Sequence, residues 1–287
     1  MTYLPYGKAA ADPWSVEITP ETAGWTYSGL RVVELDGAPV SFGTGEEEMV
    51  ILPLAGSCTV RCAPSSGSPD ETVGWELRGR ESVFDSPSDF AYVPIASQVT
   101  LEGRGRIALP AARATRRLEP RYVPASEVPV EIRGAGQATR QVNNFCAPGV
   151  FDCDKLVAVE VLTPGGNWSS YPPHKHDTAG EGEAVLEEIY YFEVAGEGMG
   201  YQRVYSSERG RIDTLAEVTS GDVVLVPYGY HGPSMATPGY DMYYLNVLAG
   251  PAEERTMAFC DDPRHAWIRS SWEDQAPDPR LPFGRTR

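Results

Sequence analysis

The chain has 287 residues, and its 24 lysines and arginines against 40 aspartates and glutamates give a formal net charge of −16. Such an acidic surface repels phosphate backbones and anionic lipid headgroups, so neither nucleic acid nor a membrane is expected as a partner. Hydrophobic residues make up 41% of the chain, and 29 glycines with 25 prolines favour a folded, turn-rich β protein over a disordered one.

The sequence carries no feature typical of export. No apolar run reaches the roughly 18 residues that cross a bilayer, and the first residues lack the charged-then-apolar pattern of a secretory signal. The five cysteines are odd in number and form no CxxC pair, so we expect neither a disulfide framework nor a zinc knuckle. A cytoplasmic protein is the resulting expectation.

Short apolar stretches separated by turns recur along the chain, and no segment sustains apolar spacing at 3.6 residues. Each stretch has about the length of a β-strand. In chain order they are 30–35, 49–52, 57–62, 90–93, 156–162, 189–194, 222–226 and 243–248. Many short strands with frequent turns predict an all-β sandwich or barrel.

An internal repeat relates the two halves of the chain. Residues 48–56 align without a gap on residues 188–196. In each half a second apolar strand follows and ends in a proline, at Pro94 and at Pro227. Two copies of one β unit explain this pattern more simply than a chance similarity between short apolar strands.

The repeat predicts two domains. A stretch rich in proline and charge at 116–131 is typical of a connector, and the polar residues from 273 onward are typical of a tail. We therefore expect one domain over residues 1–122 and a second over residues 123–287.

All four histidines lie in the second half, and two of them are closely spaced. His174 and His176 are separated by Lys175. On an extended chain successive side chains alternate between faces, so both imidazoles project together while Lys175 points away. Two imidazoles on one face of a strand suit neighbouring ligands of a single metal ion.

Two glutamates and a third histidine follow at the landmarks of the same β unit. Glu187 and Glu188 lead into the strand at 189–194, and alternation allows only one of these carboxylates to face inward. His231 follows the second landmark, Pro227. Any one of these histidines could be an ordinary hydrogen-bonded residue, but three on one unit favour a metal site. Imidazole and carboxylate together suit zinc, iron, manganese or nickel with open positions.

These residues resemble the two metal-binding motifs of the cupins. The motifs are His174-x-His176 with a glutamate opening the next strand, and Gly221-Asp222-x4-Pro227-x-Gly229-x-His231. With the repeat, the chain resembles a bicupin, which implies an all-β fold of two double-stranded β-helix (jelly-roll) units. Longer segments are similar to the 5-deoxy-glucuronate isomerase family of myo-inositol catabolism, namely 163–177, 186–191, 201–205, 239–251 and 262–267.

Two features modify the cupin pattern. Between His176 and Glu188 lies a longer insertion than simpler cupins have, and its glycine-rich, acidic residues 178–184 could form a solvated loop or a lid. The first half contains no histidine. One metal site per chain and a structural first unit are therefore expected.

The family resemblance implies an aldose–ketose isomerisation that converts 5-deoxy-D-glucuronate to 2-deoxy-5-keto-D-gluconate without a redox cofactor. Such a reaction needs an open-position metal to polarise the carbonyl and the neighbouring hydroxyl, and a group to transfer a proton. One divalent ion per chain is expected, zinc first, with manganese, iron or nickel as alternatives. The small anionic sugar acid also needs a cation for its carboxylate, because the chain is strongly acidic.

The site residues follow from the motifs and the resemblance. The expected metal ligands are His174, His176, Glu188 and His231. The candidates for proton transfer, among which the sequence does not choose, are Glu187, Tyr228, Tyr230, Asp241 and Tyr244. Arg203 is expected to bind the carboxylate unless it forms a surface ion pair, and Lys175 and Gln202 are further candidates.

Two other functions stay open at this point. Three histidines and a glutamate also suit another metal-dependent cupin enzyme such as an Fe(II) dioxygenase. A non-catalytic, sugar-binding bicupin is the second alternative. Sheet edges commonly pair between bicupins, so a homo-oligomer is also an open expectation.

Overall fold

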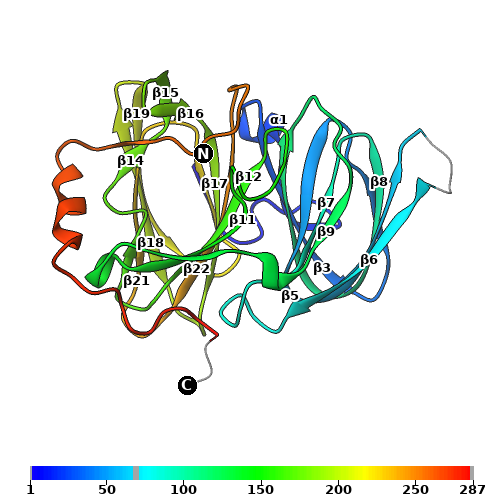
Figure 1. The fold of residues 1–287 in the computed structure, drawn as a ribbon, viewed down its shortest axis with the longest axis horizontal. Coiled ribbons are helices and arrows are strands. Elements are labelled where there is room, and N and C mark those ends of the chain that lie inside the picture. The colour runs from blue at the N-terminus through cyan, green and yellow to red at the C-terminus, as the bar shows by residue number, and fades with distance from the viewer. Residues whose placement is uncertain (1, 67–70, 285–287) are drawn as a thin grey trace.

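The computed structural model describes residues 2–66 and 71–284. Figure 1 shows two β units side by side, with few and short helices. The helices of the described residues are α1 (Pro20–Ala23) and the 3₁₀ segments η2 (Ala125–Glu127), η3 (Gly136–Ala138) and η4 (Ala266–Trp272). Within the described residues no helix combines the length and the hydropathy that crossing a membrane requires. The prediction of an all-β fold is confirmed.

In the part of the first unit that the structure describes, the strands form one antiparallel sheet of eight strands. Its strands are β2 (Trp14–Ile18), β3 (Ser28–Asp36), β4 (Val40–Gly43), β5 (Glu47–Pro64), β6 (Val73–Arg80), β7 (Phe90–Val93), β8 (Ser97–Arg113) and β9 (Arg121–Val123). The main path is β2-β3-β8-β5-β7-β9, with β4 on β8 and β6 on β5. The strands β5 and β8 approach closely at Gly56, where an added Cβ would lie 2.1 Å from a backbone oxygen of β8 and φ is +85°. Only glycine fits this position.

The second unit combines two larger sheets and a hairpin. The seven-stranded sheet runs in the order β1-β20-β17-β22-β12-β11-β10, and the other runs β19-β18-β21-β14-β23 with β13 on β21. The bounds of the first sheet are β1 (Tyr3–Leu4), β10 (Val130–Arg133), β11 (Arg140–Cys146), β12 (Val157–Thr163), β17 (Glu187–Val194), β20 (Val223–Val226) and β22 (Met242–Ala249). Those of the second are β13 (Trp168–Ser169), β14 (His174–Lys175), β18 (Gly200–Ser207), β19 (Gly210–Val218), β21 (Tyr230–Ala236) and β23 (Cys260–Asp261). The insertion forms the hairpin of β15 (Asp177–Gly180) and β16 (Glu183–Val185).

Strand pairing agrees with the internal repeat. The order β3-β8-β5-β7 in the first unit matches the order β12-β22-β17-β20 in the second. The repeated sequence opens β5 and β17, and the proline landmarks Pro94 and Pro227 follow β7 and β20. The two halves of the chain therefore place corresponding sequence in corresponding strands.

The hydrophobic core has three main parts, and the seven-stranded sheet contributes to two of them. Tyr190 and Phe192 of β17 face the interior of the second unit. Their neighbours Ile189 and Tyr191 belong to a cluster that also contains Leu30 and other residues of the first unit. The interior of the first unit forms its own cluster. Because both faces of β17 are buried, apolar residues follow one another without interruption from Ile189 to Phe192.

Buried carboxylates also join the two units. Glu48, on β5, accepts hydrogen bonds from the backbone N–H groups of Asp154, Lys155 and Leu156 at 2.8, 2.6 and 2.7 Å. The hydroxyl of Tyr92 donates to the same carboxylate at 2.7 Å. A carboxylate with four donors is fully satisfied in a water-free site, so Glu48 fixes the segment that leads into β12.

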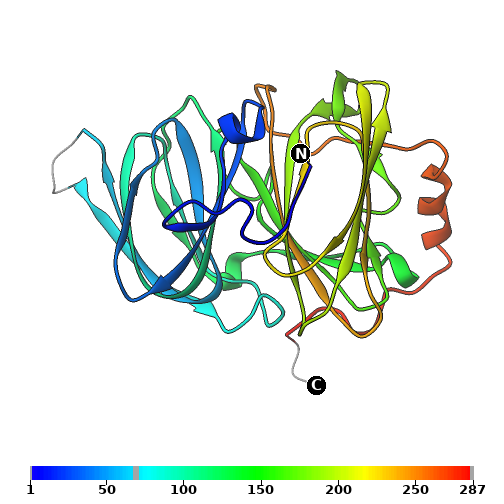
Figure 2. The ribbon, with the colours of Figure 1, turned by 180° about the vertical axis from the view of Figure 1, so that it is seen from behind.

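The division of the chain into two domains near residue 122 stays a prediction. Two strand pairings show to which sheets the segments on either side of the first unit belong. The strand β9, which contains that position, pairs with β7 of the first unit. The strand β1 pairs with β20, so the N-terminal segment extends the sheet of the second unit, as Figure 2 shows from behind. The tail contacts the second unit through the backbone N–H of Phe283, which donates to Gln141 at 2.8 Å. Its last three residues lie outside the described ranges.

Asp154 provides a test of the contact between the units. Its side chain accepts the backbone N–H groups of Thr115 and Arg116 at 2.7 and 3.0 Å, and Nε of Arg116 donates at 2.6 Å. Burial alone would raise the pKa of Asp154, but these hydrogen bonds outweigh it and lower the pKa to about 2. A carboxyl whose pKa is lower in the folded state stabilises the fold above its unfolded pKa, and this stabilisation is lost as the pH falls.

We therefore expect Asp154→Asn to lower the free energy of unfolding by about 2 kcal/mol at pH 7. The variant should also flatten the loss of stability of the parent protein between about pH 4 and pH 2. Urea unfolding at several pH values measures both effects. The exposed Asp152→Asn is the matched control, and an equal loss in both variants would contradict the assignment.

Candidate metal centre in the second unit

A cavity of about 410 Å³ lies against the inward face of the seven-stranded sheet. Its walls come from β10, β11, β12, β17 and β22, from the segment around β14, and from the C-terminal segment that includes Met257 and Phe259. The histidines of the first motif and Glu188 line this cavity.

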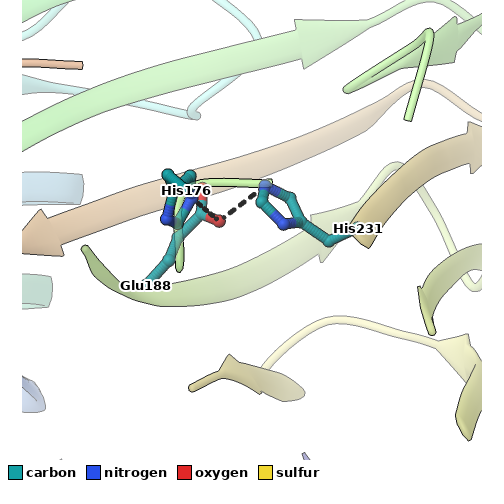
Figure 3. A group of neighbouring side chains, drawn as sticks. All are labelled: His176, Glu188 and His231. Atoms are coloured by element: carbon teal, nitrogen blue, oxygen red, sulfur yellow. Dashed lines mark hydrogen bonds and ion pairs between the residues drawn. The ribbon is translucent and has the colours of Figure 1, made fainter. Parts of the chain in front are cut away.

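Three of the expected metal ligands converge beside the cavity. His176, Glu188 and His231 are all buried, and each offers a ligand atom within 4.8 Å of the other two. Oε2 of Glu188 lies 3.0 Å from Nε2 of His176 and 2.9 Å from Nε2 of His231. Figure 3 shows this carboxylate between the two rings. The three residues come from β17, β21 and the loop after β14.

The carboxylate of Glu188 is held in place by the neighbouring strand. Asn246, on β22, donates a hydrogen bond from Nδ2 to Oε1 of Glu188 at 2.6 Å. Burial would raise the pKa of Glu188, but the imidazoles of His231 and His176 lower it well below its usual value. The residue is therefore an anion at neutral pH, with Oε2 directed at the two rings.

The imidazoles are oriented through their other ring nitrogens. Nδ1 of His176 lies 3.0 Å from the backbone carbonyl of Leu186, and Nδ1 of His231 lies 3.4 Å from that of Gly229. Both Nε2 atoms are thus turned toward Glu188. Nε2 of His231 is buried and lies 2.9 Å from Oε2 of Glu188, but this contact is not aligned as a hydrogen bond, which leaves the nitrogen available to a further group.

His174 stands next to this group. It pairs directly with His231 across β14 and β21, and the two ring centres are 4.5 Å apart. Burial lowers the pKa of His174 well below its usual value, and the neighbouring His231 adds to the effect. A neutral imidazole is the form that binds metals.

The donor set fits a divalent metal ion. Imidazole nitrogens and a carboxylate oxygen are the usual ligands of zinc, iron, manganese and nickel in proteins. Backbone carbonyls orient the rings of His176 and His231, and the side-chain amide of Asn246 orients the carboxylate of Glu188. Such outer hydrogen bonds are usual in established metal sites. Nε2 of His231, which is buried beside Oε2 of Glu188 without an aligned hydrogen bond, is a further donor for a cation at this position.

Among the candidates for proton transfer, Tyr244 lines the cavity. Its hydroxyl lies 3.1 Å from Oγ of Ser170, which lies 3.1 Å from the hydroxyl of Tyr190. Ser170 has φ of +45°, a left-handed conformation that costs free energy in a residue other than glycine and is often found at functional sites. Sequence reasoning missed Ser170 and Tyr190, although alternation places Tyr190 on the same face as Glu188.

Glu187 faces away from the cavity, as the alternation of side chains along β17 requires. Its carboxylate accepts the backbone N–H groups of Thr26, Tyr27 and Ser28 at 2.7, 2.6 and 2.9 Å. Ser28 is the first residue of β3 in the first unit, and the other two residues directly precede it. Glu187 is therefore a contact between the two units.

The other three candidates also lie outside the described cavity walls. The hydroxyl of Tyr228 donates to a backbone carbonyl of β19 at 3.2 Å. Tyr230 stacks on Tyr205 with ring centres 5.5 Å apart. Asp241 accepts the backbone N–H of Gly165 at 2.8 Å and so supports a turn.

Arg203 lines a separate surface pocket. Its Nη1 donates to Asp213 on the adjacent strand at 2.5 Å. The ion-pair alternative foreseen for this residue is thus present in the structure, whereas its role toward a substrate stays a prediction.

Lys175 and Gln202 are likewise engaged by other groups. The ammonium of Lys175 lies 3.0 Å from Asp177 and 2.8 Å from Glu183, so it holds the β15–β16 hairpin against β14. Gln202 is fully buried and accepts a hydrogen bond from the hydroxyl of Ser234. The proposed roles of both residues in substrate binding stay predictions.

Known proteins resemble this chain over most of its length. A 5-deoxy-glucuronate isomerase of Geobacillus kaustophilus is 42% identical over 263 residues, which cover 89% of this chain and 91% of the relative. One of Bacillus subtilis strain 168 is 37% identical, over 88% of this chain and 91% of the relative.

Solved structures agree with the fold. An IolB-like protein of Salmonella typhimurium LT2 has a TM-score of 0.83 and 35% identity, over 93% of this chain and 99% of that one. An oxalate decarboxylase of Lactobacillus farciminis has a TM-score of 0.62 at 12% identity, over 88% and 87% of the two chains, which bears on the fold alone. The predicted bicupin fold is confirmed.

The family of the chain follows from the same comparisons. Residues 3–268, which include both units and the candidate metal centre, match the KduI/IolB family. Together with relatives that share more than a third of its residues along most of its length, this match shows that the chain belongs to the KduI/IolB family.

Proposed function

We propose that this protein is a metal-dependent isomerase that converts 5-deoxy-D-glucuronate to 2-deoxy-5-keto-D-gluconate. The observation that carries the proposal is the convergence of His176, Glu188 and His231 beside a cavity, in a chain whose relatives are 5-deoxy-glucuronate isomerases. The substrate would be a small sugar acid, in keeping with the size of the cavity. Cytoplasmic location and a homo-oligomeric state stay predictions.

The metal would be held by His174, His176, Glu188 and His231. Zinc is our first choice because three imidazoles and one carboxylate match its preferences, with manganese, iron or nickel as alternatives. When bound, the ion would act as a Lewis acid toward the carbonyl and the neighbouring hydroxyl of the substrate. The protein supplies the orientation of these ligands, through Asn246 and the backbone carbonyls described above.

The reaction moves hydrogen between two adjacent carbons without net oxidation. The C2–H hydrogen is transferred to C1, and the proton of the C2 hydroxyl ends on the former aldehyde oxygen. Tyr244 suits the second transfer, because a phenol can donate one proton and accept another. Burial raises the pKa of Tyr244, so its hydroxyl is protonated at neutral pH and can donate to a carbonyl oxygen. Ser170 holds this hydroxyl in place and links it to Tyr190.

Proton NMR of 5-deoxy-glucuronate with the metal-loaded protein in D₂O tests the proposed activity. We expect the anomeric signals to disappear while the signals of the keto acid grow, without consumption of oxygen. Deuterium in the product would indicate a base and an enediol, whereas its absence would indicate a hydride shift or a shielded proton.

No conversion by protein with confirmed metal content would contradict the isomerase proposal. Uptake of oxygen with the substrate would instead favour the dioxygenase alternative. Removal of the metal by a chelator should abolish activity, and its return should restore it.

Glu188 and Glu187 offer a matched pair for testing the metal centre. Glu188→Gln should lower metal affinity by at least about tenfold, because even the loss of an outer hydrogen-bond partner has an effect of this size. Glu187→Gln should keep its metal but lower the stability by about 1–3 kcal/mol, since three backbone donors lose a charged acceptor. Metal analysis and thermal unfolding of both variants measure this difference. Metal loss only in Glu187→Gln would mean that the wrong carboxylate was chosen.

Tyr244→Phe tests the proton-transfer role. Removal of the hydroxyl should lower kcat by about 10²- to 10⁴-fold, the usual contribution of general acid–base catalysis, while metal content stays the same. Steady-state kinetics and metal analysis together check this outcome. A comparable loss in Tyr228→Phe, with Tyr244→Phe active, would transfer the role to Tyr228.

A further inference from the structure

Three arginines line the cavity of the candidate metal centre, namely Arg133, Arg140 and Arg269. Two of them are neutralised by carboxylates. Arg133 pairs with Glu131 at 2.8 Å, and Arg269 binds Asp261 through two nitrogens, one of them at 2.7 Å. Among the residues that the structure describes, no carboxylate forms an ion pair with Arg140.

The guanidinium of Arg140 is positioned but not neutralised. Nη1 donates to the backbone carbonyl of Ala138 at 3.1 Å, and the guanidinium carbon lies 5.6 Å from the centre of the Trp272 ring. Arg140 also lies directly opposite Arg133 in the pairing of β10 with β11, and like charges in such a pair destabilise a sheet. These contacts leave most of the donors of Arg140 free for another acceptor.

The charge of Arg140 is not compensated within the cavity. Burial, together with the positive charges of Arg133 and Arg269, lowers the pKa of Arg140 to about 10. The group still carries its proton at neutral pH. A partly buried cation beside two others is unfavourable unless an anion joins it, so this wall of the cavity suits a negatively charged ligand.

The cavity therefore has two ends of different chemistry. Glu188 on β17 and the imidazoles of His174 and His176 at β14 lie at one end, and Arg140 lies on β11, three strands away from β17 in the seven-stranded sheet. Tyr244 lies between them on β22. Burial is the main reason why the pKa of Tyr244 is raised. The charges at both ends of the cavity also act on this pKa, which Arg140 lowers and Glu188 raises.

We propose that Arg140 binds the carboxylate of the substrate and so directs the aldehyde end of the sugar acid toward the metal centre. This inference rests on the proposed function and gives Arg140 the part that sequence analysis assigned to Arg203. A guanidinium can bind a carboxylate through two parallel hydrogen bonds, which fix the direction of an extended chain. The ligand class is an acyclic or open-chain uronic acid with its carbonyl at the far end.

The test compares 5-deoxy-glucuronate with its C6 alcohol, 5-deoxyglucose, as substrates of the metal-loaded protein. Arg140→Gln should lower kcat/KM for 5-deoxy-glucuronate by about 10- to 150-fold, mainly through KM, because a charge-assisted hydrogen-bond pair is lost. For 5-deoxyglucose, kcat/KM should change by less than about twofold. Arg140→Lys keeps the charge but not the planar fork, so it should recover only part of the preference for the acid.

Two further arginine variants sharpen the comparison. Arg104→Gln, an exposed position in the first unit, is the matched control and should leave the ratio for acid and alcohol unchanged. Arg203→Gln tests the alternative that Arg203 binds the carboxylate of the substrate. If it lowers the ratio while Arg140→Gln does not, the carboxylate binds at Arg203 and the proposal is overturned.

Binding measurements separate this inference from the activity. Calorimetry should show that the wild-type enzyme binds D-glucuronate more tightly than D-glucose, and that Arg140→Gln loses this difference while keeping its metal and its melting temperature. Turnover by the wild type with an unchanged acid-to-alcohol ratio in Arg140→Gln would overturn the role of Arg140 alone. Absence of turnover in the wild type would overturn the function, and the glucuronate comparison would then still decide whether Arg140 binds the carboxylate.

Discussion

Side chains alternate between the two faces of β17, and each face meets a different part of the molecule. One face carries Glu188 and Tyr190 into the second unit, where the metal ligands and the cavity lie. The other carries Glu187 and Ile189 to the first unit. Because successive residues of a strand cannot share a face, the site and the contact between units are fixed by the same register. A slip of one residue would destroy both.

The repeat places a glutamate at corresponding positions of the two units, and the two glutamates have different contacts. Glu48 and Glu188 occupy corresponding places at the starts of β5 and β17. In the second unit the carboxylate meets two imidazoles, whereas in the first it meets backbone N–H groups of the segment that leads into the second unit. Glu187 makes the reciprocal contact with the start of β3. A buried carboxylate needs several donors or a cation, and each unit satisfies this need differently.

Local periodicity made part of this structure predictable from the sequence. Alternation alone separates Glu187 from Glu188, and it also places Tyr190 on the same face as Glu188. Arg140 has no such signal, because its importance depends on which carboxylates lie near it across the sheet. Arg203 and Asp213 lie on adjacent strands, so their ion pair becomes visible only with the strand register. The left-handed backbone of Ser170 is equally a property of tertiary packing.

The pairing of β1 with β20 has a consequence for the order in which parts of the chain can fold during synthesis. Tyr6 donates its backbone N–H to Asp222, a residue 216 positions later in the chain. During synthesis the first unit can therefore fold while the short strand ahead of it has no partner. Only after β20 has left the ribosome can β1 pair with it and cover this edge of the seven-stranded sheet. Until then the unpaired backbone groups of that edge could pair with another chain and promote aggregation. A strand that is translated before the first unit thus completes a sheet of the second unit, which is translated after it.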